Sequence, residues 1–191
     1  MAPQELRQTI ASMNRAEHET HQMETASAEY PADAVVSIAE RLDAAGVRYW
    51  IDGGWGVDAL LGHQTRPHSN LNLAVALADK ADLAAVLRGS GYTLVSNDGG
   101  VEHWATENGL EIEVGYVDIS HTRRAEDGEL VYGDRGLPYP VGAFGAIGTI
   151  GGVDVPCCHA DYQMWSHVGH DDIGRRDMLA LHRRFGLPLP D

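Results

Sequence analysis

The alternation of apolar and polar residues is most regular over residues 70–77, Asn-Leu-Asn-Leu-Ala-Val-Ala-Leu. Successive side chains of an extended chain point to opposite sides, so the leucines and the valine share one side, and Asn70 and Asn72 share the other. The pattern predicts a half-buried β-strand whose second face carries two amides.

Elsewhere apolar residues recur every three or four positions, which is typical of amphipathic helices. One such stripe follows Asp33, a residue type that caps helices, and stops at Gly46. The expected helices cover residues 33–45, 55–61, 79–88 and two pieces within 160–185. The expected strands cover residues 47–51, 70–77, 92–95, 101–106, 110–117, 129–132 and 153–156, and residues 133–152 are expected to be a loop with one short strand.

This mixture of elements predicts an α+β fold, in which helices flank a mixed β-sheet and a small helical lobe follows. We expect residues 1–30 to form an N-terminal helical arm or tail that could dock across a homodimer. Residues 31–158 would form the main domain, and residues 159–191 would form the C-terminal helical lobe that closes a cleft.

The amino-acid composition limits the kinds of partner that we expect for this protein. The formal net charge of −14 argues against a nucleic acid, because binding a phosphate backbone needs clustered Lys and Arg. No apolar run approaches the roughly 20 residues of a membrane span. The only cysteines, Cys157 and Cys158, are neighbours, which rarely meet disulfide geometry. We therefore expect a cytoplasmic protein that acts on a small molecule, with neither a nucleic acid nor a membrane as partner.

Gly53 and Gly54 stand between an expected strand and an expected helix. Glycines at such a turn let backbone N–H groups approach an anion closely, and the helix N-terminus adds a favourable dipole. Arg66 and His68 follow in a loop, where they could supply positive charge. The stretch from Ile51 to Leu77 therefore carries most of the candidate chemistry.

This stretch resembles the minor nucleotidyltransferases that inactivate lincosamide and aminoglycoside antibiotics. The matching residues are Gly53-Gly54-Trp55, Asp58, Gly62, Thr65-Arg66 and His68, with later matches at Glu111–Gly115, Asp127-Gly128 and from His167 to Pro188. The resemblance covers roughly residues 33–190. It implies a nucleotidyltransferase-like fold with a small-molecule cleft between the sheet and the C-terminal helices.

One departure from that family changes the expected function. The resemblance implies that two strand aspartates and a third acid hold Mg²⁺ while a nucleotide passes from a nucleoside triphosphate to a drug hydroxyl. This chain has Asn70 and Asn72 in place of the two aspartates, and Glu113 stands at the position of the third acid. A neutral amide cannot offset the charge of a metal ion, so we expect no metal ligand.

Our main hypothesis is therefore a metal-independent enzyme of natural-product (secondary) metabolism, of the lyase or cyclase type, which needs no cofactor. It would use acid–base chemistry for a dehydration, a Michael-type addition or a cyclisation, since ten histidines are many for this length and histidine titrates near neutral pH. The predicted catalytic residues are Glu113, His68 and His170. The predicted substrate-binding residues are Gly53, Gly54, Trp55, Arg66, Asn70, Asn72, His103, Trp104 and Asp171.

Two alternatives stay open. The first is an antibiotic nucleotidyltransferase that depends on Mg²⁺ and a nucleoside triphosphate, represented here by an inactive form with asparagines at positions 70 and 72. The second is a protein that binds an antibiotic without turning it over.

Overall fold

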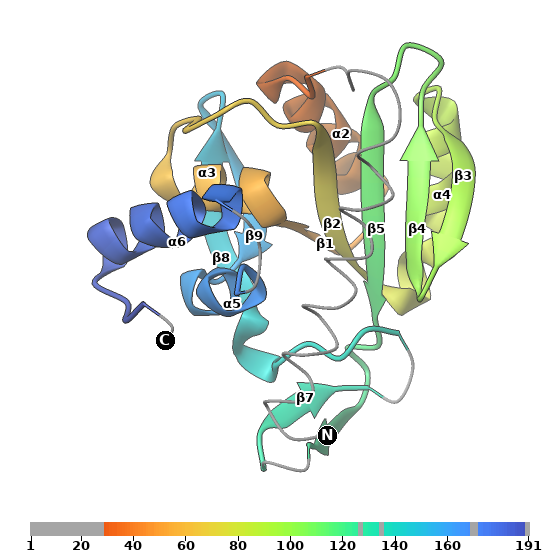
Figure 1. Ribbon diagram of the computed structural model, residues 1–191. Helices are drawn as coiled ribbons and strands as arrows, with labels where there is room; N and C mark the ends of the chain where they lie inside the picture. The colour runs from red at the N-terminus through yellow and green to blue at the C-terminus, as the bar shows by residue number, and fades with distance from the viewer. Residues whose placement is uncertain (1–28, 126–127, 134–135, 169–171, 190–191) are drawn as a thin grey trace.

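The computed structural model describes residues 29–125, 128–133, 136–168 and 172–189. Its centre is a seven-stranded sheet in the order β3-β4-β5-β2-β1-β9-β8 (Figure 1). Its strands are β1 (Tyr49–Asp52), β2 (Asn70–Ala76), β3 (Thr93–Asp98), β4 (Val101–Ala105), β5 (Glu111–Val117), β8 (Phe144–Ile150) and β9 (Val153–Cys158). Strands β6 (Thr122–Arg124) and β7 (Leu130–Tyr132) form a separate two-stranded sheet.

The described helices are α2 (Ala32–Ala44), α3 (Gly53–Leu61), α4 (Lys80–Gly89), α5 (Ala160–Ser166) and α6 (Asp172–Phe185), with short 3₁₀ turns at Leu77–Asp79 and Val141–Ala143. Helices α2 and α4 lie behind the sheet, whereas α5 and α6 lie beside α3 at the β9–β8 end (Figure 1). In the part of the chain that the structure describes, no helix is long and apolar enough to cross a membrane.

The two faces of β2 differ as the alternation of its residues predicts. Leu71, Leu73 and Val75 are buried in the main core, together with the apolar stripes of α2 and α4. The opposite face of β2 carries Asn70 and Asn72, each partly exposed. The predicted α+β fold with a mixed sheet and flanking helices is therefore confirmed, because β2 pairs antiparallel with β1 and parallel with β5.

The main differences from the predicted elements lie near the C-terminal end of the sheet. Residues 144–150, expected to belong mostly to a loop, form the long edge strand β8. The predicted N-terminal arm lies outside the described residues except for Glu29 and Tyr30. The domain boundaries and the homodimer stay predictions.

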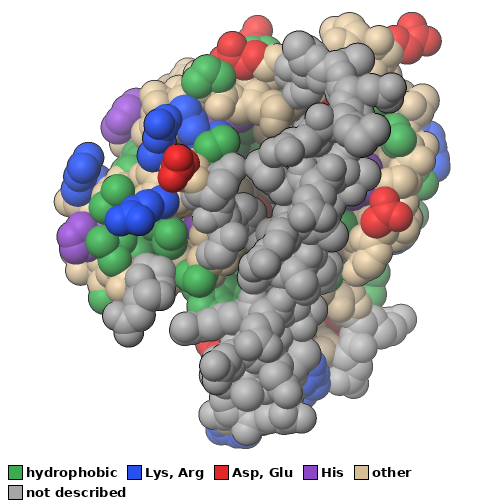
Figure 2. Space-filling view, in the orientation of Figure 1, with side chains coloured by type: hydrophobic (Ala, Val, Ile, Leu, Met, Phe, Trp, Pro, Cys, Tyr) green, Lys and Arg blue, Asp and Glu red, His purple; other side chains and the backbone are tan. Residues whose placement is uncertain are grey.

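Helix α6 carries four exposed arginines. Figure 2 shows Lys and Arg side chains over α6, where Arg175, Arg176, Arg183 and Arg184 are exposed. An acidic side chain lies beside them in the same view.

The only lysine of the chain ties α4 to the sheet. Lys80 Nζ lies 2.5 Å from Glu102 Oε1, and Tyr116 Oη donates to the same carboxylate at 2.7 Å. Burial alone would raise the pKa of Glu102, but the bonds from Lys80 and Tyr116 outweigh burial and lower it. The carboxylate is therefore a charged and fully bonded group inside the core.

We expect Glu102→Gln to lower the free energy of unfolding by about 2 kcal/mol near pH 7, because hydrogen bonds to a charged group become neutral ones. Because the pKa of Glu102 is lower in the folded than in the unfolded protein, its charge stabilises the fold above the unfolded pKa of about 4.3. This stabilisation is lost as the pH falls through the pKa of the folded protein. Urea titrations at several pH values measure both effects. The exposed Glu40→Gln in α2 is the control; equal stabilities of the two variants would contradict the prediction.

Candidate active site

A row of polar side chains crosses one face of the sheet. Asp52 on β1 is the register partner of Asn72 on β2, which is the partner of Glu113 on β5, which in turn is the partner of His103 on β4. Register partners share a face, and adjacent strands lie about 4.8 Å apart. We call these four residues together with Asn70 the polar row.

Glu113 is held from two sides within the polar row. Asn70 Nδ2 donates to Glu113 Oε1 at 2.8 Å, and His103 Nδ1 lies 3.9 Å from the same oxygen. The Glu113 side chain is 20% exposed and that of His103 is 28% exposed, so both can be reached from solvent. The geometry suits a carboxylate that accepts a proton beside an imidazole that can take part in the transfer.

The glycine turn lies directly beside the polar row. Gly53 has a φ of +59°, in the left-handed region, and its N–H donates to Asp52 Oδ1 at 2.8 Å, so Asp52 caps α3. A Cβ on Gly53 would lie 3.2 Å from Asn72 Nδ2. The first turn of α3, with its free N–H groups, therefore lies next to the amide of Asn72.

Two residues that were predicted to serve the site form a partly buried network with α3 and α6. Arg66 Nη2 donates to Asp177 Oδ2 at 2.7 Å, and Arg66 Nη1 lies 3.0 Å from His68 Nδ1. His68 Nε2 lies 2.5 Å from Asp58 Oδ2. Because a guanidinium can only donate, His68 Nδ1 accepts and Nε2 carries the proton. Both ring nitrogens of His68 are therefore engaged within this network.

Gly54 is the residue that lets this network approach α3. An added Cβ would lie 2.5 Å from both Arg66 Nη2 and His68 Nδ1. We expect Gly54→Ala to lower the free energy of unfolding by about 1–3 kcal/mol, because overpacking forces buried groups apart. Gly89→Ala in α4 is the control, since nothing lies within 4 Å of its added Cβ. Thermal unfolding of both variants measures the effect, and equal melting temperatures would contradict this explanation.

Asp52 is a member of the polar row that the sequence analysis missed. Burial raises its pKa, while the bond from Gly53 N–H and the nearby His167 act against burial. The Cys158 thiol lies close by, and burial raises the pKa of that thiol well above its usual value. Gln163 is fully buried next to this group, and its amide has no hydrogen bond of good geometry among the described residues. The polar row thus continues into a buried group of polar side chains at α5.

The family resemblance implies that a divalent metal ion binds at the polar row. The side chains present there show whether such an ion would fit. Among the described residues, no group of three or more His, Cys, Asp or Glu side chains is placed to hold a metal ion. Asn70 turns a hydrogen-bond donor toward Glu113, and Asp52 is bonded to the backbone of Gly53. The residues present do not fit an acid-rich Mg²⁺ site, because Mg²⁺ takes oxygen ligands and needs carboxylate charge.

Comparison with known proteins decides the family. The family model for aminoglycoside-2''-adenylyltransferases matches residues 34–181, most of the chain. This protein belongs to that family. The predicted resemblance to lincosamide and aminoglycoside nucleotidyltransferases is thereby confirmed.

Individual relatives agree with this family. A lincosamide resistance protein of Staphylococcus haemolyticus is 28% identical over 130 residues, which are 65% of this chain and 76% of the relative. The lincomycin-bound crystal structure of the lincosamide adenylyltransferase LnuA aligns with a TM-score of 0.66 at 20% identity, covering 81% of this chain and 98% of that one. A crystal structure of ANT(2'')-Ia with adenylyl-2''-tobramycin aligns with a TM-score of 0.60 at 19% identity, covering 81% and 89%. At these identities the two structures support the fold.

Family membership corrects the main functional expectation. The hypothesis of a metal-independent lyase or cyclase of secondary metabolism is wrong, because the chain belongs to an adenylyltransferase family and has a lincosamide resistance protein as a relative. The expectation of no cofactor is wrong for the same reason, since adenylyl transfer draws on a nucleotide. The amides of Asn70 and Asn72 change the charge of the polar row, but this change does not by itself establish a different reaction.

The other predicted site residues have different surroundings. Trp104 is 1% exposed, lies on the opposite face of β4 from His103 and donates to Glu102, so its indole does not border the polar row. Trp55 is 2% exposed and packs against the His68 ring at 4.6 Å. His170 and Asp171 lie outside the described residues.

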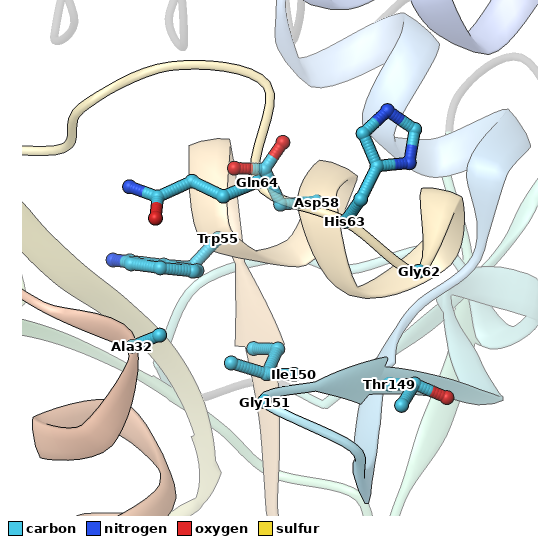
Figure 3. Close-up of a pocket in the computed structure, with 9 residues that line it drawn as sticks. All are labelled: Ala32, Trp55, Asp58, Gly62, His63, Gln64, Thr149, Ile150 and Gly151. Atoms are coloured by element: carbon cyan, nitrogen blue, oxygen red, sulfur yellow. The ribbon is translucent and has the colours of Figure 1, made fainter.

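One small cavity lies between α3 and the β8–β9 turn. Figure 3 shows the Trp55 ring and Asp58 on its α3 side and Ile150 on its strand side. Its volume is about 40 Å³, enough for a few water molecules. Sites for drug-sized ligands measure roughly 300–1,000 Å³, so this cavity is not the substrate site.

Proposed function

We propose that this protein transfers an adenylyl group from ATP to a hydroxyl of a small-molecule antibiotic of the lincosamide or aminoglycoside type. The observation that carries the proposal is the juxtaposition of the α3 N-terminus with Asn72, Glu113 and His103 on one face of the sheet. Family membership supplies the reaction class. A cytoplasmic reaction is part of the proposal, because nucleoside triphosphates are made there.

The nucleotide would bind beside the glycine turn. The first N–H groups of a helix have no acceptor inside the helix, and the helix dipole favours anions at this end. Asp52 already accepts from Gly53 N–H, so the following N–H groups of α3 are those that can meet a phosphate. The triphosphate would then lie next to Asn72, with its α-phosphorus toward Glu113.

Glu113 would accept the proton of the antibiotic hydroxyl. That oxygen attacks the α-phosphorus of ATP, the bond to the β-phosphate oxygen breaks, and pyrophosphate leaves. Asn70 fixes the carboxylate at 2.8 Å, and His103 at 3.9 Å can receive or pass on the proton. These side chains thus supply orientation and proton transfer in the proposed reaction.

A pyrophosphate-release assay tests the proposed function. The purified protein is given ATP, GTP, CTP or UTP together with each of a panel of lincosamides and aminoglycosides, with Mg²⁺ in the buffer. We expect release with ATP that depends on at least one antibiotic. No release above a heat-denatured sample for any pair of nucleotide and antibiotic would overturn the proposal.

A further inference from the structure

The amide of Asn72 occupies the centre of the polar row. It is flanked by Asp52 on β1 and Glu113 on β5. Its Nδ2 atom lies at the start of α3, 3.2 Å from where a Cβ on Gly53 would be. Among the described residues, this amide has no hydrogen-bond partner, in contrast to Asn70, whose amide donates to Glu113. The structure thus leaves a hydrogen-bond donor free beside a helix N-terminus.

The charges around Asn72 favour an anion more than a set of aspartates would. The two amides on β2 are neutral, so they do not repel a phosphate group. Glu113 faces the imidazole of His103 and the amide of Asn70, and the carboxylate of Asp52 is bound to Gly53 N–H. A carboxylate at position 72 would instead repel phosphate oxygens at contact distance unless a cation lay between them.

We infer that Asn72 is a phosphate-binding residue, whose amide nitrogen donates a hydrogen bond to a triphosphate oxygen of the bound nucleotide. The inference rests on the proposed function. An acidic residue at position 72 would bind a metal cation, whereas the amide of Asn72 would contact the phosphate anion directly. Introducing an aspartate should therefore weaken nucleotide binding, and most strongly where no cation screens the two negative charges.

Calorimetric titration of the full-length protein with ATP tests this, in EDTA and in Mg²⁺. We expect the wild type to bind ATP in both buffers. Asn72→Asp should weaken binding about tenfold or more in EDTA, and Mg²⁺ should restore part of that loss. Asn72→Ala, which removes the donor without adding charge, should weaken binding by a smaller factor in both buffers. Thermal melting of each variant checks that it folds.

Asn108→Asp is the matched control, because it makes the same charge change in the exposed loop between β4 and β5. Its Oδ1 accepts from Thr106 Oγ1, a bond that a carboxylate keeps, so ATP binding should not change. If Asn72→Asp binds ATP as well as the wild type in EDTA, or more tightly than the wild type in Mg²⁺, the role of Asn72 is overturned while the proposed function stands. If no variant and no buffer gives ATP binding, both fail.

Discussion

Glu113→Gln is expected to reduce the rate of adenylyl transfer by about 10²–10⁴-fold, the usual contribution of a positioned general base. A glutamine keeps the size of the side chain and can still accept the hydrogen bond from Asn70 at this position. It cannot take up the proton of the attacking hydroxyl. Substrate binding should change little, so the loss should appear in kcat and much less in KM.

Steady-state kinetics of pyrophosphate release measure this effect, with Glu107→Gln in the exposed loop before β5 as the control. The activity of His103→Gln should lie between those of Glu113→Gln and Glu107→Gln, because His103 lies 3.9 Å from Glu113, beyond hydrogen-bond distance. A Glu113→Gln enzyme with activity within a few-fold of the wild type would exclude Glu113 as the base.

The second large effect concerns stability. Asp177→Asn is expected to lower the free energy of unfolding by about 2–3 kcal/mol, because it removes the charge from a buried carboxylate that accepts two hydrogen bonds from the partly exposed Arg66. Asp177 is 2% exposed and accepts from Arg66 Nε at 3.2 Å and from Nη2 at 2.7 Å. His167 Nε2 lies 3.5 Å from the same carboxylate. The network joins α6, α5 and the loop after α3, so its loss should loosen the C-terminal lobe.

The pH dependence of stability checks the same group. Burial alone would raise the pKa of Asp177, but the bonds from His167 and Arg66 outweigh burial and lower it. Its stabilisation is therefore complete above the unfolded pKa of about 3.9 and is lost as the pH falls through the lower folded value. Urea unfolding of Asp177→Asn should show a smaller loss on acidification than the wild type. Asp154→Asn, on the exposed side of β9, should behave like the wild type.

Local patterns were sufficient to predict most of the fold. The two-residue alternation predicted β2, and the stripe after Asp33 predicted α2, because burial of one face requires those periods. Strand β8 was expected to be mostly a loop, since its glycines suggested turns. A Cβ on Gly148 would lie 2.5 Å from the backbone of Ala59, so this glycine permits close packing of β8 against α3.

The candidate site was less predictable, because it depends on pairings between distant strands. The partnership of Asn72 with Glu113 requires the order of β2 and β5 in the sheet, which no local pattern contains. Arg66 and Asp177 lie 111 positions apart, so nothing in either segment indicated that they pair. Asp52 could have been found from the sequence, because it directly precedes the glycine turn.

Mass spectrometry of an antibiotic after incubation with the protein, ATP and Mg²⁺ tests the proposed reaction most directly. We predict a product heavier by one adenosine monophosphate minus water, with the new ester on a hydroxyl located by fragmentation. The product should be absent with ATP omitted and strongly reduced with Glu113→Gln. An antibiotic that is bound but unchanged, or changed in mass without an adenylyl group, would contradict the assignment of this chain as an adenylyltransferase.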